Sequence, residues 1–95
     1  MPAVVRRGDI NSGGGAAVQG ARSVVVNGRA VVGPGSPVTP HPCCGAPGCH
    51  MHCVAVTTGG SGSVIAEGKP VILVGDVDTC GHNRIQGSPD VVAGR

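Results

Sequence analysis

The feature that most constrains this chain is an internal repeat, which indicates that one short unit occurs three times within 95 residues. An offset of 40 residues aligns residues 24–25 with 64–65, 27–29 with 67–69 and 31–32 with 71–72. An offset of 67 residues aligns Asp9 with Asp76, Ser12 with Thr79, Gly14 with Gly81, residues 18–20 with 85–87 and residues 24–25 with 91–92. Three units in a chain too short for three domains predict a single domain, residues 1–95, with pseudo-threefold symmetry.

Each unit contains a bend, a short valine-rich strand, a two-residue turn and a second strand. Asn27-Gly28 between two apolar runs is a strong hairpin signal, because both central residues of such a turn take positive φ. Glu67-Gly68 is a weaker form of the same turn. The pattern predicts strands near residues 23–26, 29–32, 63–66, 69–74 and 91–93. The third copy is expected to be cut off at Arg95, and Asp9 and Asp76 are expected to accept backbone N–H bonds in turns.

The chain has no Phe, Tyr or Trp, and it contains 18 glycines and 8 prolines. It therefore lacks the side chains that bury the most area per residue. A sequence rich in valine and glycine is a poor helix former and a good former of short strands and tight turns. We expect an all-β fold of short β-hairpins, whose light core needs an additional cross-link.

Potential metal ligands concentrate in residues 41–53, which hold three of the four histidines and four of the five cysteines. The other two, Cys80 and His82, flank a single glycine. Clustered imidazoles and thiolates are the ligands that tetrahedral zinc prefers. In a reducing cytoplasm cysteines bind metal more often than they form disulfides, and five cysteines fit poorly with a complete disulfide framework. The segment predicts a metal site; the alternative is a set of disulfides among Cys43, Cys44, Cys49 and Cys53.

The net charge of +2 arises from seven scattered basic residues, of which only Arg6 and Arg7 are adjacent. Because the chain also has no aromatic side chain to stack on a base, nucleic-acid binding is not indicated. No secretory apolar segment follows Met1, and no apolar run approaches membrane-spanning length. We expect a protein that is made in the cytoplasm and does not insert stably into a membrane.

Several segments resemble the PAAR-repeat family, the tip proteins of type VI secretion spikes and contractile phage tails. Residues 5–9 with 12–14 are similar to the family's opening, residues 24–29 to its first hairpin, and residues 68–76 to the region that gives the family its name. The Pro-Ala-Ala-Arg signature is present only as Pro70-Val71-Ile72-Leu73, without its arginine, and Gly13 stands where many members carry histidine. The chain thus resembles a divergent branch of the family, without an effector extension.

The resemblance implies a cone-shaped domain with one structural zinc ion near its point, or iron in its place, held by histidines and a cysteine. His41 and Cys80 stand where the family carries ligands. His50 and His52 are two residues apart, so on an extended segment both rings point to one side. The expected ligands are His41, His50, His52 and Cys80, and Cys44 or His82 is the alternative to one histidine. Four protein ligands close the coordination shell, so the site is expected to be structural.

The resemblance also implies a function without enzymatic activity: a tip that pierces membranes and caps a trimeric spike, either VgrG-like or the central spike of a phage tail, with one tip per trimer. The mature protein is then located at the end of a virion tail or a secreted spike, and cargo effectors bind as separate proteins. Two other classes stay open. A zinc-ribbon-like module needs paired Cys-x-x-Cys knuckles, which this sequence lacks. A cysteine-rich redox or metal-carrier protein needs an exposed, reactive thiol or a metal that exchanges readily.

Overall fold

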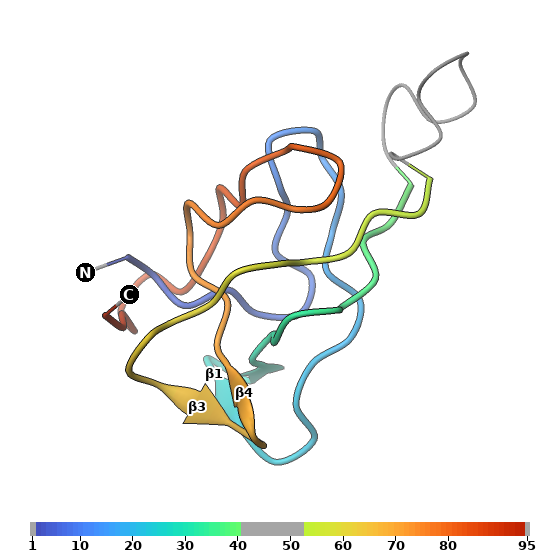
Figure 1. Cartoon of the computed structure of the whole chain (residues 1–95). Coiled ribbons are helices and arrows are strands. Elements are labelled where there is room, and N and C mark those ends of the chain that lie inside the picture. Colours follow the sequence, from blue (N-terminus) through green and yellow to red (C-terminus); the bar gives the residue numbers. More distant parts are fainter. Residues whose placement is uncertain (1, 41–52, 95) are drawn as a thin grey trace.

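The computed structural model describes residues 2–40 and 53–94. This described part contains no helix and two antiparallel β-hairpins (Figure 1). The first hairpin pairs β1 (Val25–Val26) with β2 (Arg29–Ala30), and the second pairs β3 (Ile65–Ala66) with β4 (Lys69–Pro70). The prediction of a small all-β fold built from short hairpins is confirmed.

Both hairpin turns have the backbone conformation that their sequences predict. The φ angles are 55° at Asn27 and 79° at Gly28, and 51° at Glu67 and 80° at Gly68. Two consecutive left-handed residues give a turn whose twist matches that of the flanking strands. Glutamate rarely adopts positive φ, but the Glu67 carboxylate accepts hydrogen bonds from the bend that contains Ser23, which helps to hold the turn in place.

The named strands are shorter than the predicted ones, because the chain leaves its hairpin partner after two residues. Beyond β2, Val31 forms a bridge with Arg6, and the Val32 N–H donates to the Val5 carbonyl at 3.2 Å. Beyond β4, Leu73 forms a bridge with Val4. One further hydrogen bond joins each hairpin, from Val31 to Val24 and from Val71 to Val64, and the apolar residues beyond it pair with a neighbouring unit.

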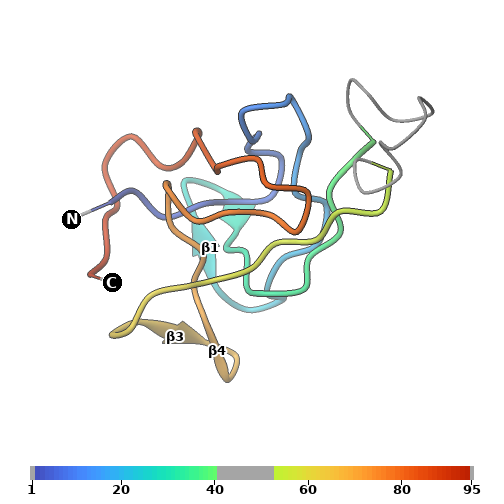
Figure 2. The ribbon, with the colours of Figure 1, turned by 45° about the horizontal axis from the view of Figure 1, so that its top comes forward.

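The two ends of the chain pair with each other, so the expectation of a truncated third unit is wrong. Ala3 forms an antiparallel bridge with Val92, and the Val4 N–H donates to the Val91 carbonyl at 3.0 Å. These contacts correspond to those within the other two hairpins, where Val31 donates to Val24 and Val71 to Val64, each at 3.1 Å. Figures 1 and 2 show the two ends side by side. The first residues of the chain thus supply the second strand of the third unit.

Equivalent hydrogen bonds recur in all three units at the offsets of 40 and 67 residues. Val5 donates to Ile72 at 2.8 Å, Ile72 donates to Val32 at 2.7 Å, and Val32 donates to Val5 at 3.2 Å, which closes a triangle. All three residues are fully buried. A second set joins Gly8 to Ala17, Gly35 to Thr57 and Gly75 to Arg84, each at 2.8 Å. The backbone of each unit is therefore held by the next one.

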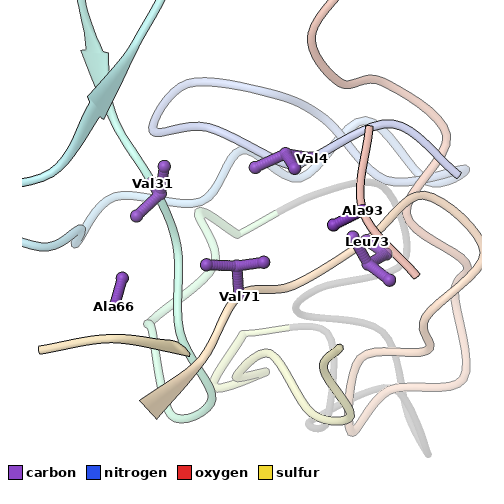
Figure 3. Packing of buried hydrophobic residues seen from close by; sticks show 6 residues of the cluster. All are labelled: Val4, Val31, Ala66, Val71, Leu73 and Ala93. Carbon is purple, nitrogen blue, oxygen red and sulfur yellow. The ribbon is translucent and has the colours of Figure 1, made fainter. Parts of the chain in front are cut away.

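The core consists of small clusters of aliphatic side chains. The cluster nearest the hairpins contains Val4, Val31, Ala66, Val71, Leu73 and Ala93, which come from distant parts of the sequence (Figure 3). A second cluster contains Val5, Ala17, Val32 and Ile72, and a third contains Val38, Ala55 and Cys80. Burying a valine or isoleucine side chain contributes roughly 1.5–3 kcal/mol, so these clusters hold the units together without any aromatic residue.

Candidate functional site

Three loop segments meet on the side of the molecule away from β3 and β4 (Figures 1 and 2). They are joined by equivalent backbone hydrogen bonds: Ser12 donates to Asn83 at 2.8 Å, Thr39 to Ala16 at 2.9 Å and Thr79 to Val56 at 2.9 Å. Two of these loops turn through glycines of positive φ, Gly14 at 89° and Gly81 at 93°. The third segment contributes Thr39 and Val56, which stand before and after residues 41–52 in the sequence. All three units therefore meet at these hydrogen bonds.

Cys80 is the one predicted metal ligand within the described residues. His41, His50 and His52 lie outside them. The Cys80 side chain is buried and packs with Val38 and Ala55, which stand shortly before and after residues 41–52. Among residues 2–40 and 53–94, no group of three or more His, Cys, Asp or Glu side chains could hold a metal ion. Cys80 thus packs against the residues that flank the histidine-rich segment on both sides in the sequence.

The alternatives to this ligand set are partly described. His82 is half-buried, and its Nδ1 lies 3.0 Å from the Ser12 hydroxyl oxygen. This contact links two of the three loops, so His82 has a role in a turn contact. The alternative to a metal site was a set of disulfides that includes Cys53, and Cys53 is disulfide-bonded. Cys44 lies outside the described residues.

A buried ion pair lies beneath these loops, and sequence reasoning did not identify it. Arg84 Nη1 donates to Asp78 Oδ2 at 2.8 Å, and both side chains are completely buried. Asn11 Nδ2 donates to the same oxygen at 2.7 Å, and Arg84 Nη2 donates to the Asp9 carbonyl. Within the described part of the chain, Asp78 Oδ1 and Arg84 Nε have no hydrogen-bond partner. The repeat gave no signal for this pair, because Val38 and Thr57 occupy the equivalent positions in the second unit.

Asp9 and Asp76 have the structural role that the sequence predicts. Asp9 Oδ2 accepts the Arg6 N–H at 2.8 Å, and Asp76 Oδ2 accepts the Leu73 N–H at 2.9 Å. Asp9 is also paired through Oδ1 with Arg6 at 3.0 Å and with Arg29 at 3.2 Å. The hydrogen bond to Asp9 raises the pKa of the Arg6 guanidinium. These carboxylates stabilise turns and are engaged by their own chain.

At the hairpin end, each turn is hydrogen-bonded to the bend of a neighbouring unit. Glu67 accepts from the Arg22 N–H at 3.1 Å and from the Ser23 N–H and hydroxyl at 2.8 and 2.6 Å. Asn27 donates to Asp90 at 2.9 Å. At the equivalent third position, the Gly94 carbonyl accepts the hydroxyl of Ser63 at 3.2 Å and that of Ser61. These contacts form a closed series around the hairpins.

This series of contacts is expected to weaken in acid. The hydrogen bond from the Ser23 hydroxyl lowers the pKa of Glu67, and the hydrogen bond from Asn27 lowers the pKa of Asp90. Groups with a lowered pKa in the folded state contribute stability that is fully present above their unfolded pKa, about 4, and is lost as the pH falls through the lower folded value. Unfolding measured from pH 7 to pH 2 should show this loss. A Glu67→Gln/Asp90→Asn variant should show a flatter acid limb, and an unchanged limb would contradict the assignment.

The hairpin end also exposes apolar side chains at equivalent positions. Val25 is 62% exposed, Ile65 60% and Val92 50%. Neighbouring positions in the same strands point inward, where Ala66 and Ala93 join the first core cluster and Val26 packs against it. Each unit therefore presents a large aliphatic side chain to the outside at this equivalent position.

No protein-family model matches the chain, and a search of curated proteins gives no match. Within residues 2–40 and 53–94 there is also no helix that is long and apolar enough to cross a membrane.

Proposed function

We propose that this chain is a divergent PAAR-like spike tip, which caps the trimeric spike of a contractile injection machine with one copy per trimer. The observation that carries the proposal is the threefold recurrence of equivalent hydrogen bonds, such as the triangle among Val5, Val32 and Ile72. One chain with three near-equivalent units can dock onto the threefold axis of a trimer, because each subunit then meets a similar surface. A domain without such repetition would meet each of the three identical subunits with a different surface.

The hairpin end is the proposed docking surface. Val25, Ile65 and Val92 present exposed aliphatic side chains at equivalent positions, and exposed apolar groups in a repeated arrangement are typical of a protein contact surface. In the described part of the chain, β1 and β3 each pair with only one named strand. Their outer edges could continue the β-structure of a spike, which would also cover edges that otherwise favour aggregation.

The loop end is the proposed point of a cone, cross-linked by one zinc ion, or by iron, bound to His41, His50, His52 and Cys80. Cys80 supports this assignment, because its buried side chain packs with Val38 and Ala55. These two residues flank the segment that carries the three histidines. The ion would join loops that have little apolar area of their own. Four protein ligands leave no open position for substrate, so the proposed role is structural and not enzymatic.

In this proposal the tip acts by force. On contraction of the machine the folded domain is driven through a cell envelope, without stable membrane insertion. The small residues of the loops allow a narrow point. The buried Arg84–Asp78 pair lies within one loop, and its hydrogen bonds with the Asn11 side chain and the Asp9 carbonyl join this loop to a second one. A redox or metal-carrier function would need an exposed thiol, whereas of the described cysteines Cys80 is buried and Cys53 is disulfide-bonded.

The docking proposal is tested by mixing the protein with a trimeric β-helical spike protein of such a machine and measuring the complex by native mass spectrometry. We expect one chain per trimer. The Val25→Asp/Ile65→Asp variant should lose binding and keep its melting temperature, because both side chains are exposed. Ile85→Asp is the matched control, since Ile85 is also exposed, at 54%, but lies outside the hairpins. Equal binding by both variants, or a stoichiometry of three chains per trimer, would refute the proposal.

The metal proposal is tested by measuring zinc and iron in protein purified without added metal. We expect about one ion per chain, and Cys80→Ala should weaken its binding by more than about 100-fold, because losing a ligand costs more than losing a group that only orients one. His82→Asn is the control and should keep the ion. Full metal content in the Cys80→Ala variant would remove Cys80 from the ligand set.

A further inference from the structure

A groove of about 210 Å³ lies between the first two units, lined by residues 19–22, 31–36, 66–67 and 69–71. Its polar lining includes Gln19, Arg22, Ser36 and Lys69. Pockets for cofactors and drug-sized ligands are larger, about 300–1,000 Å³. The size of this groove therefore suits a single side chain from another protein better than a small-molecule ligand.

The groove carries a positive charge that lacks an acidic partner among the described residues. Lys69 is exposed, and its aliphatic chain lies over Gly33, where an added Cβ would stand 3.2 Å from Lys69 Cβ and 3.3 Å from Cδ. The ion pairs in the described part of the chain join Arg6 and Arg29 to Asp9 and Arg84 to Asp78, and none involves Lys69. Glu67 also lines the groove, but its two oxygens already accept from the Arg22 N–H and from Ser23.

The protein itself shows how the cation of an equivalent groove is paired. A second groove is lined by Arg7, Gly8, Gly28, Arg29 and Ala30. Arg29 stands at the position equivalent to Lys69, and its Nη1 binds Asp9 Oδ1 at 3.2 Å. The residue equivalent to Asp9 in the first groove is Ser36. Lys69 thus occupies the place of a cation for which the equivalent carboxylate is replaced by a serine.

We propose that the groove between the first two units binds an aspartate or glutamate side chain of a second protein. The carboxylate of that side chain would pair with Lys69 as the Asp9 carboxylate pairs with Arg29. Arg22, on the wall of the same groove, adds to the attraction for an acidic group, and the partner segment is held against Gly33 and Pro34. The proposal rests on this groove alone and holds whether or not the hairpin end docks onto a spike.

The test is a titration of ¹⁵N-labelled protein with the pentapeptide Gly-Val-Asp-Val-Gly, acetylated and amidated so that its only charge is the aspartate. We expect saturable shifts at the amides of Gly33, Ser36 and Lys69, with His82 unaffected. Lys69→Met should weaken binding about threefold to fivefold, as expected for an exposed ion pair, and Lys69→Arg should preserve it. Because Lys69 is exposed, neither change should disturb folding.

Two further measurements test whether the groove recognises a carboxylate. Ser36→Asp places a carboxylate where the other two units have Asp9 and Asp76, so this variant should fold with an unchanged or higher melting temperature and should no longer bind the peptide. The matched peptide with asparagine should give no saturable shifts. Equal shifts with the asparagine peptide, an unchanged affinity in Lys69→Met, or tighter binding of inorganic phosphate than of the peptide would each overturn the proposal.

Discussion

Replacing Asp78 with asparagine is expected to lower the free energy of unfolding by about 3–5 kcal/mol, the usual cost of removing one partner from a buried ion pair. The expectation follows from the burial of Arg84, whose side chain is completely inaccessible and whose Nε has no hydrogen-bond partner among the described residues. Without the Asp78 charge, the guanidinium keeps its positive charge inside the protein with no compensating carboxylate. Urea denaturation followed by circular dichroism measures the loss.

A double replacement tests whether the loss of stability comes from the uncompensated charge of Arg84. Asp78→Val with Arg84→Met removes both charges, and valine is the residue that the second unit carries at the position of Asp78. Replacing a buried ion pair by apolar groups is often neutral or stabilising, so the double variant should be more stable than Asp78→Asn alone. If the double variant were the less stable of the two, the pair would be a net source of stability and the argument from uncompensated charge would be wrong.

Replacing Gly60 with alanine is expected to cost about 2–5 kcal/mol, because two separate penalties add at this position: positive φ costs about 1–2 kcal/mol for a residue with a side chain, and overpacking typically costs about 1–3 kcal/mol. The φ of Gly60 is 128°, where an L side chain is strained, and a Cβ would stand 2.7 Å from Pro70 Cβ in β4. A lower midpoint of urea unfolding in the Gly60→Ala variant measures the combined cost of the two penalties.

Two other glycines measure the penalties one at a time. Gly20→Ala tests crowding alone, since a Cβ there would stand 2.6 Å from Ala30 Cβ at a position without positive φ. Gly28→Ala tests backbone strain alone, since φ is 79° and no described atom outside its chain neighbours lies within 4 Å of the added carbon. Each single cost should be smaller than the cost at Gly60. A harmless Gly20→Ala would show that the first bend can move away from β2.

The hairpins and their turns could be predicted from the sequence because their causes are local. Asn27-Gly28 specifies two consecutive left-handed residues, and alternation of inward and outward positions follows from the strand period of two. The roles of Asp9 and Asp76 were predictable for the same reason, because a short carboxylate in a bend binds an N–H a few residues away. Strand ends were not predictable, since Val31 and Leu73 pair with Arg6 and Val4 from the first segment of the chain.

The candidate site could be predicted only in its composition. The clustering of histidine and cysteine indicates a metal, but the grouping of ligands depends on how distant loops approach one another. The structure adds one such fact, the position of Cys80 beside Val38 and Ala55. The groove beside Lys69 depends on how the first two units pack against each other, whereas the serine that stands in place of the repeated aspartate is visible in the sequence.

By itself the sequence determined the repeating unit, the turn chemistry and the lack of an aromatic core, because each depends on residue type and short-range spacing. Only the tertiary structure decided that Ala3 and Val92 pair to complete the third unit, and that Arg84 and Asp78 form a completely buried ion pair. Both outcomes depend on which distant segments come together when the chain closes. Residue type sets the local geometry, whereas long-range packing selects the partners.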